Sequence, residues 1–134
     1  MICFEMPSTD PFLNQAFEEY IFTHITDDDV FLLWRNDPVV VFGRYQNPFA
    51  ESNLTYAFLH GISALRRISG GGTVYHDRGN FNYAWMRRAV PGEGYDAFLA
   101  PMVEALRKLG IPAEQGRLCD IAIAGKKISG SAQK

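Results

Sequence analysis

Three consecutive glycines, Gly70–Gly72, lie between two segments that both favour extended strands. The residues before them are Arg66–Ile68, and the residues after them are Thr73–Tyr75. Threonine, valine and tyrosine are strand formers, so the glycines are predicted to form a loop between strands. The common glycine-rich nucleotide motifs open a helix instead, and a P-loop also places a lysine after its last glycine. This one segment therefore excludes a P-loop or a dinucleotide-binding turn and favours a sheet with the loop at its edge.

The glycine segment has the chemistry of an anion site. Glycine has no Cβ, so backbone N–H groups can approach a phosphate closely. Arg67 adds a planar fork of donors that suits phosphate or carboxylate. The alternative is a flexible loop with solvated arginines, and composition alone does not decide between these two interpretations.

The rest of the chain predicts an α/β (α+β) fold with a mixed, largely antiparallel sheet flanked by helices. Apolar spacing predicts helices, and β-branched and aromatic runs predict about five to seven strands. Val30–Asn36 and Val39–Arg44 are expected to pair as a hairpin across Asp37-Pro38. The predicted helices are 12–25, 50–60 and 95–109, and the first is expected to start at the capping residues Ser8–Asp10 and Pro11. The remaining predicted strands are 62–68, 73–76 and 81–86, with a turn at Asp77–Asn80 and another at Gly125.

Composition narrows the classes of partner. A chain of 134 residues fits one domain. Its formal net charge of −2 gives no electrostatic reason to expect a nucleic acid. With two cysteines, Cys3 and Cys119, and no basic, apolar leader, we expect free thiols in a reducing cytoplasm. No apolar run reaches the ~20 residues of a membrane helix, so no membrane partner is expected.

Two further segments carry polar groups of interest. Lys126 and Lys127 precede Ile128-Ser129-Gly130, and in a strand the two lysines point to opposite faces. One of them can then face a ligand, although surface lysines on an edge strand are the commoner case. His76 and Asp77 also face apart, and no third residue stands at metal-site spacing.

Four segments in order along the chain resemble the lipoate–protein ligase A family. They are FLNQAFEEYIF, LLWRNDPVVVFGRYQNPFAE with its G-R-x-Q-N turn, RRISGGGTVYHDRGNFNY, and GKKISGSAQK. The resemblance spans essentially the whole chain, and the second and third segments are highly specific. It implies the α/β catalytic core shared with biotin protein ligases. It also implies that ATP and lipoate form lipoyl-AMP, whose acyl group moves to a lysine of a lipoyl domain of a 2-oxoacid dehydrogenase or of the glycine-cleavage carrier protein.

The resemblance assigns roles to particular residues. Lys127 matches the family's lysine in K-[IV]-S-G-x-A and would contact the lipoate carboxylate and the α-phosphate. Arg67 would hold phosphate, and Asp120 would contact the adenylate and Mg²⁺. The residues matched to the nucleotide-lining segment are Gly72, Thr73, Val74 and Tyr75, and those matched to the lipoate side are Gly71, His76, Arg67 and Lys127.

Two departures from the family pattern keep alternatives open. Cys119 stands where the family often has asparagine, which raises an octanoyl or lipoyl transferase of the same fold that uses a cysteine nucleophile. The chain also ends at Lys134, where the pattern reads as sheet. We therefore expect residues 1–134 to be the N-terminal part of a ligase-type catalytic domain without the family's C-terminal continuation, and a non-catalytic ligand-binding homologue is the third alternative.

Overall fold

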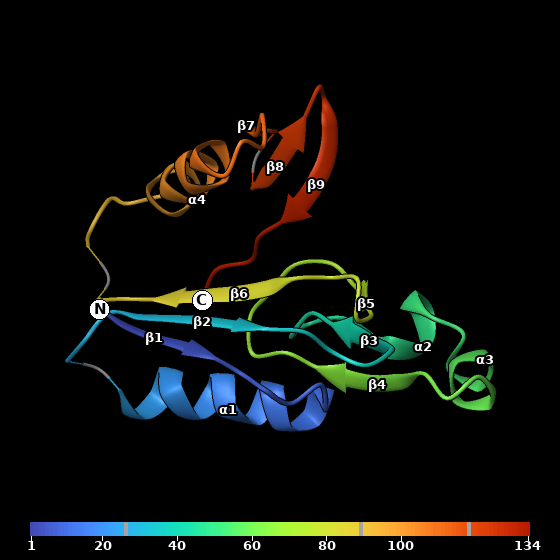
Figure 1. Cartoon of the computed structure of the whole chain (residues 1–134). Coiled ribbons are helices and arrows are strands. Elements are labelled where there is room, and N and C mark those ends of the chain that lie inside the picture. The colour runs from blue at the N-terminus through green and yellow to red at the C-terminus, as the bar shows by residue number, and fades with distance from the viewer. Residues whose placement is uncertain (26, 89, 118) are drawn as a thin grey trace. The chain divides into compact units, whose positions relative to one another are not determined.

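The computed structural model describes residues 1–25, 27–88, 90–117 and 119–134 (Figure 1). These residues fall into two compact units, Met1–Arg88 with Lys134, and Ala89–Gln133. The described residues form three sheets of three strands each, so the expectation of one sheet with five to seven strands is wrong. Four of the six strand pairings are antiparallel, which confirms the mixed, largely antiparallel character.

The first unit holds two of the sheets. The first sheet has the order β1-β2-β6, with β1 parallel and β6 antiparallel to β2. The second has the order β4-β3-β5, with β4 parallel and β5 antiparallel to β3. The elements of this unit are β1 (Ile2–Glu5), α1 (Pro11–His24), β2 (Val30–Trp34), β3 (Val39–Phe42), α2 (Pro48–Glu51), α3 (Leu54–Leu59), β4 (Ser63–Arg66), β5 (Val74–His76) and β6 (Asn82–Met86).

Helix α1 begins where the sequence predicts and packs on the first sheet. The Asp10 carboxylate accepts from the N–H of Phe12 at 2.8 Å, and Pro11 takes the first helical position, where no N–H is needed. Phe17 meets Phe4 of β1 edge-to-face, with ring centroids 5.8 Å apart. The core of the unit comprises Ile21, Val30, Leu32, Trp34, Val39, Val41, Phe42 and Ala57.

The predicted hairpin of β2 and β3 is wrong, because the two strands belong to different sheets. A tight hairpin turn needs residues at positive φ, and Asn36-Asp37-Pro38 contains none. The connection is fixed to the start of α1 instead. Asn14, which is fully buried, donates through Nδ2 to Arg35 O and to Asn36 Oδ1, both at 3.0 Å. The chain is thereby redirected from one sheet to the next.

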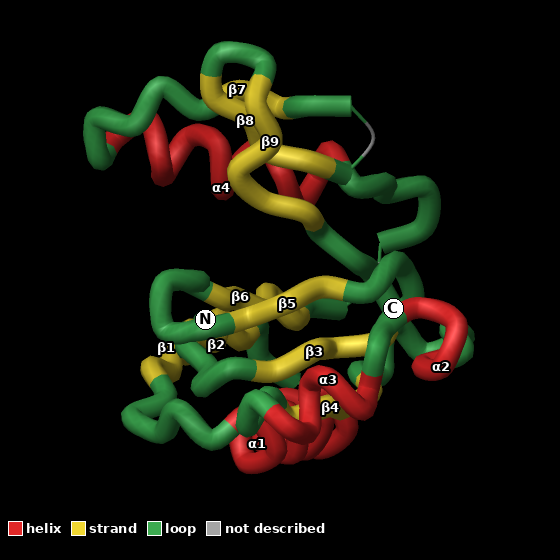
Figure 2. The backbone as a smooth tube through the Cα atoms, turned by 90° about the vertical axis from the view of Figure 1, so that its right-hand side faces the viewer, coloured by secondary structure: helices red, strands yellow, loops and turns green. Residues whose placement is uncertain are grey.

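Two other local predictions need correction. The single helix expected over 50–60 is two helices, α2 and α3, which Figure 2 shows separately. The helix cannot run continuously through Asn53, because this residue is the N-cap of α3. Its side chain accepts from the N–H of Tyr56 at 2.9 Å. The Asp77–Asn80 turn forms as predicted, with Gly79 N–H donating to Asp77 Oδ1 at 2.8 Å. The strands on either side of it, however, join different sheets.

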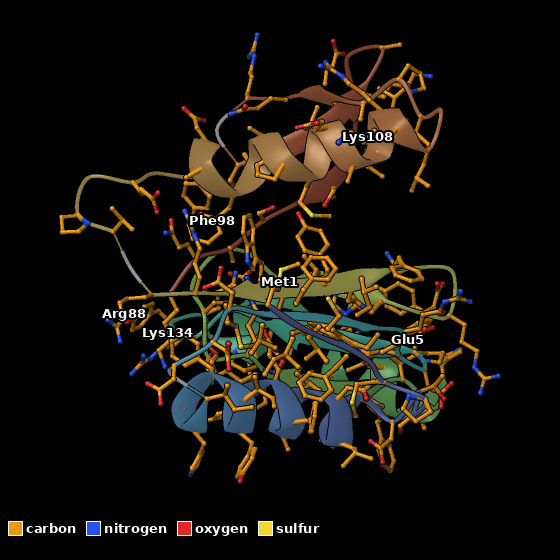
Figure 3. The ribbon with its side chains drawn as sticks, turned by 60° about the vertical axis from the view of Figure 1, so that its left-hand side comes forward. Met1, Glu5, Arg88, Phe98, Lys108 and Lys134 are labelled. Carbon is orange, nitrogen blue, oxygen red and sulfur yellow. The ribbon has the colours of Figure 1, made fainter. Side chains whose placement is uncertain are left out.

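The second unit packs one helix on a small antiparallel sheet. Its elements are α4 (Asp96–Lys108), β7 (Glu114–Gln115), β8 (Asp120–Ile123) and β9 (Lys126–Gly130), in the order β7-β8-β9. Leu99 and Val103 of α4 pack with Ala113 and Ile121 in the core. Figure 3 shows side chains along α4, including Phe98 and Lys108. Ala124 and Gly125 have φ values of 48° and 73°, so the predicted turn at Gly125 is a tight hairpin turn.

None of the described helices is both long enough and apolar enough to cross a bilayer.

Candidate functional site

The glycine segment forms a loop between strands, as predicted. It connects β4 to β5, the two strands that flank β3 in the second sheet. Gly71 and Gly72 are exposed, and Gly71 has a φ of 88°, which is the left-handed region that favours glycine. The loop therefore presents its backbone at the end of the second sheet.

Arg67 determines the direction of the loop's peptide groups. Its Nη2 lies 2.8 Å from Gly72 O and also contacts Gly70 O, and its Nε lies 3.2 Å from Ser69 Oγ. The peptide bonds are trans, so the N–H of each peptide points opposite to its C=O. The N–H groups of Gly71 and Thr73 consequently point away from the guanidinium. Exposed backbone N–H groups of a glycine-rich loop are donors of the kind that bind phosphate.

A second turn, Gly43–Asn47, packs against the glycine loop. A Cβ built on Gly43 would lie 2.0 Å from Gly71 O, which is much too short for a contact between atoms that are not bonded. Gln46 Oε1 accepts from the N–H of Gly43 at 2.9 Å and from Thr73 Oγ1 at 2.7 Å. The family's G-R-x-Q-N turn and its glycine signature are thus one packed structure in this chain.

Arg67, Glu18 and His76 shift one another's pKa values. Burial raises the pKa of the Glu18 carboxyl, which is opposed by the Gln15 amide that donates to it at 2.7 Å and by the charge of Arg67. Burial lowers the pKa of Arg67, and the charge of Glu18 opposes this shift. The pKa of His76 is also lowered, first by burial and then by Arg67, against an opposing effect of Asp77. Arg67 therefore stands at the centre of a half-buried charge cluster.

The contact of His76 with Asn36 favours the neutral form of the ring. The Asn36 Nδ2 group can only donate, and it lies 3.2 Å from His76 Nδ1, so this ring nitrogen must be the acceptor. The contact agrees with the lowered pKa of the ring. Strand β5 places His76 beside the buried Asn36. The contact of His76 with lipoate stays a prediction.

A pH dependence of stability follows from His76. Its folded pKa lies below the unfolded value of about 6.5, so the unfolded chain takes up this proton first as the pH falls. We expect the free energy of unfolding, measured in urea, to fall as the pH drops from about 7 toward 5, and His76→Gln to show a shallower fall. Parallel curves for the two proteins would show that His76 does not titrate as inferred.

The second unit holds the other predicted residues, Asp120 and Lys127. Lys127 Nζ lies 2.7 Å from Asp120 Oδ1, and the two side chains are 61% and 25% exposed. A bulge between Ile121 and Ala122 sets this register of β8 against β9. The lysine lies over Gly130, where an added Cβ would come within 3.0 Å of Nζ. The hairpin therefore directs an exposed ammonium beside a half-buried carboxylate.

The metal prediction rests on Asp120 alone. Over residues 1–25, 27–88, 90–117 and 119–134, no group of three or more His, Cys, Asp or Glu side chains could hold a metal ion. Mg²⁺ commonly takes only one or two protein carboxylates when a nucleotide supplies the remaining oxygens. Asp120 fits such a minor role, since the ion pair with Lys127 engages only Oδ1. Cys119, beside it, is a half-buried free thiol.

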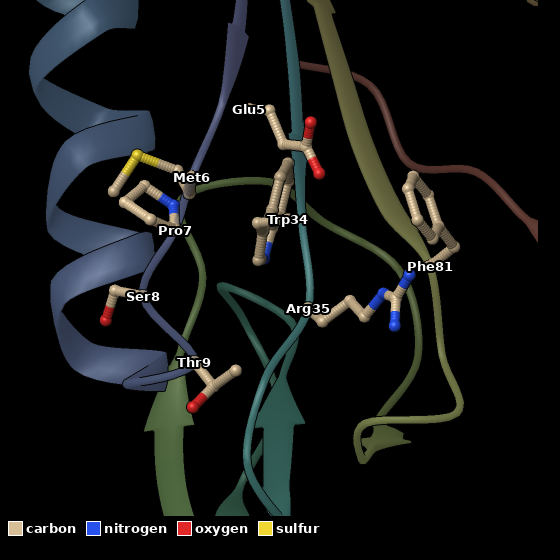
Figure 4. A pocket seen from close by; sticks show the side chains of 8 residues that line it. All are labelled: Glu5, Met6, Pro7, Ser8, Thr9, Trp34, Arg35 and Phe81. Atoms are coloured by element: carbon tan, nitrogen blue, oxygen red, sulfur yellow. The ribbon is translucent and has the colours of Figure 1, made fainter.

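Figure 4 shows a pocket in the first unit that none of the predicted site residues lines. Residues 5–9 form one wall, and Trp34, Arg35 and Phe81 complete it. The Arg35 guanidinium lies over the Phe81 ring, 5.2 Å from its centroid. The pocket is therefore separate from the chemistry assigned to the glycine loop.

Sequence analysis missed three residues that build the loop. Gly43, Gln46 and Arg66 have no predicted role beyond their place in recognised motifs, yet Gly43 packs against Gly71, Gln46 binds Thr73, and Arg66 binds the turn that carries both. The adjacent pair Arg66-Arg67 was one usable signal, because consecutive strand residues serve opposite faces.

Comparison with known proteins identifies what the chain is similar to. The family model described as the lipoyl protein ligase A/B catalytic domain matches residues 10–134. The lipoate-protein ligase LplJ of Bacillus subtilis is 39% identical over 92% of this chain and 38% of its own length. Lipoate–protein ligase 1 of Staphylococcus aureus is 41% identical over 92% of this chain and 39% of its own length. The chain thus spans about two fifths of these relatives.

Solved structures agree with the observed fold. LipL1 of P. falciparum in complex with lipoate superposes with a TM-score of 0.89 at 26% identity, over 99% of this chain and 44% of that one. A lipoate-protein ligase A bound with ATP gives 0.87 at 30%, over 98% and 59%. The bipartite lipoate protein ligase of Thermoplasma acidophilum, studied with its E2 lipoyl domain, gives 0.85 at 30%, over 98% and 54%.

Proposed function

Because the chain belongs to the lipoyl protein ligase A/B catalytic domain family, we propose that it activates lipoate with ATP and passes the lipoyl group to a lysine of an acceptor protein. The observation that carries the proposal is the loop whose Gly70 and Gly72 carbonyls turn onto Arg67. That arrangement leaves the N–H groups of Gly71 and Thr73 to bind a phosphate. The lipoate and ATP named in the structures of its neighbours are the substrates that such a loop would serve.

The proposed chemistry has two balanced steps. An oxygen of the lipoate carboxylate attacks the α-phosphorus of ATP, the bond to the β-phosphate oxygen breaks, and pyrophosphate leaves. A lysine amine of the acceptor then attacks the acyl carbon of lipoyl-AMP, forms an amide, loses a proton and releases AMP. Both reactants of the first step are anionic, so a fixed cation lowers their repulsion and stabilises the developing charge.

We assign that cation to Lys127. Its ammonium is exposed, and the hairpin positions it through the ion pair with Asp120. The nucleotide phosphates are assigned to the backbone at Gly71, Gly72 and Thr73, with Val74 and Tyr75 beside them, and Arg67 shapes the loop in addition to any phosphate contact. Mg²⁺, bound chiefly by the phosphates with Asp120 as a protein ligand, would supply charge neutralisation.

The acceptor and the extent of the protein are part of the proposal. A lipoyl domain, of the kind named with the Thermoplasma ligase, is the expected acceptor, or the glycine-cleavage carrier protein in its place. Residues 1–134 are proposed to be the N-terminal part of a longer catalytic domain, since the matched relatives extend well beyond the aligned region. A cytoplasmic location stays a prediction from the cysteine content.

Pyrophosphate release tests the proposed function against its alternatives. We expect release when the chain is mixed with ATP, Mg²⁺ and lipoate, and none when lipoate is omitted. A cysteine transferase would instead move an acyl group between carriers without ATP, and a binding homologue would bind both substrates and turn over neither. Either of these last results would replace the ligase assignment.

A further inference from the structure

Arg66, the first residue of the arginine pair, makes a convergent set of contacts that the proposed function does not use. It is the last residue of β4, and its Nη1 lies 2.8, 3.0 and 2.8 Å from the carbonyl oxygens of Gly43, Arg44 and Gln46. Three carbonyl groups of one turn therefore converge on one cationic nitrogen. Hydrogen bonds from a charged donor are among the stronger ones in proteins.

The turn held by Arg66 is the turn on which the glycine loop rests. The N–H of Arg44 donates to Ser69 O at 2.9 Å. Gln46 Oε1 bridges Gly43 N–H and the Thr73 hydroxyl, and Gly43 leaves no room for a side chain against Gly71. A displacement of the turn would consequently displace the loop at both of its ends.

The two arginines bind two different segments. Arg67 contacts the carbonyls of the glycine loop itself, whereas Arg66 contacts only the supporting turn. We infer that Arg66 is a positioning residue that orients the nucleotide loop through the Gly43–Gln46 turn, without touching the nucleotide. This inference rests on the proposed function for its activity readout, and on the geometry alone for its structural readout.

ATP binding by two variants of Arg66 tests the inference. We expect Arg66→Met to weaken ATP binding, measured by calorimetry, by about 10- to 100-fold, the equivalent of about one charged hydrogen bond. Arg66→Lys should retain most of the affinity, because an ammonium keeps the positive charge and offers three N–H donors where Arg66 Nη1 offers two. In the pyrophosphate assay, Arg66→Met should raise the KM for ATP and leave kcat at saturating ATP nearly unchanged, since the reacting groups stay in place. Arg35→Met, which removes an exposed arginine of the same unit, is the matched control and should bind as the wild type does.

A second readout separates this inference from the proposed function. In protein labelled at glycine, the amide NMR signals of Gly70–Gly72 should move in ligand-free Arg66→Met and stay in place in Arg35→Met. If the wild type binds no ATP, the proposed function fails, and these signals still decide the inference. Should Arg66→Met not fold, Gln46→Ala removes the link to Thr73 and should move the same signals. Unmoved glycine signals together with wild-type affinity, in whichever of the two variants folds, would overturn the inference.

Discussion

Replacing Lys127 with alanine is expected to abolish pyrophosphate release while the protein stays folded. A single preorganised charge at a developing transition-state charge accounts for roughly 10²- to 10³-fold in rate, and we expect kcat to fall by at least that factor. The ion pair with Asp120 is 61% exposed on the lysine side, so its removal should change the free energy of unfolding by only about 0–1 kcal/mol. Initial rates of pyrophosphate release, with circular dichroism as the check on folding, provide the measurement.

The neighbouring residues supply the controls for this prediction. Lys126→Ala removes an exposed lysine adjacent in β9 and should leave most of the activity. Cys119→Ala should do the same, because the proposed chemistry needs no covalent enzyme intermediate. If Cys119→Ala abolishes turnover and Lys127→Ala does not, the chain is a cysteine transferase and the assignment of Lys127 is wrong.

Replacing Gly43 with alanine is expected to destroy nucleotide binding. The added methyl group would lie 2.0 Å from the backbone oxygen of Gly71, and neither backbone can yield without moving the turn or the loop. Overpacking of this kind typically lowers the free energy of unfolding by about 1–3 kcal/mol. Because the displaced oxygen belongs to the glycine loop, we expect ATP binding to become undetectable by calorimetry even in the fraction that folds.

Gly70→Ala is the matched control for Gly43→Ala. It adds the same methyl group to the same loop, at a position where a Cβ meets nothing within 4 Å and the backbone is not in the left-handed region. Urea unfolding of this variant should resemble that of the wild type. If both variants unfold at the same urea concentration and bind ATP equally well, the contact of Gly43 with Gly71 does not set the loop.

Local sequence patterns predicted the helices, strands and loops of this fold better than they predicted which strands pair. The start of α1 at Asp10-Pro11 and the loop nature of Gly70–Gly72 are confirmed, because capping groups and strand formers act over a few residues. The predicted pairing of β2 with β3 is wrong. The path of the chain between these strands depends on Asn14, a residue distant in sequence whose buried amide binds the connection. An asparagine inside an amphipathic helix gives no sign of which backbone groups it will meet.

For the candidate site, too, the sequence predicted which residues take part but not which groups they contact. Motif resemblance selected Arg67 and Lys127, but it could not show that Arg67 faces the loop's own carbonyls. The ion pair of Lys127 with Asp120 depends on a bulge in β8, and a bulge shifts the register without a clear signature in the sequence. The role of Arg66 depends on three carbonyl directions, which follow from backbone dihedrals and not from residue type.

The exchange of radiolabelled pyrophosphate into ATP is the most direct test of the central claim, that this chain joins lipoate to AMP. The reaction isolates the first step, requires no acceptor protein, and returns label to ATP only if the adenylate forms reversibly. We predict exchange in the presence of lipoate and Mg²⁺, loss of exchange without lipoate, and loss of exchange in Lys127→Ala. Absence of exchange in wild-type protein that calorimetry shows to bind both ATP and lipoate would contradict the account.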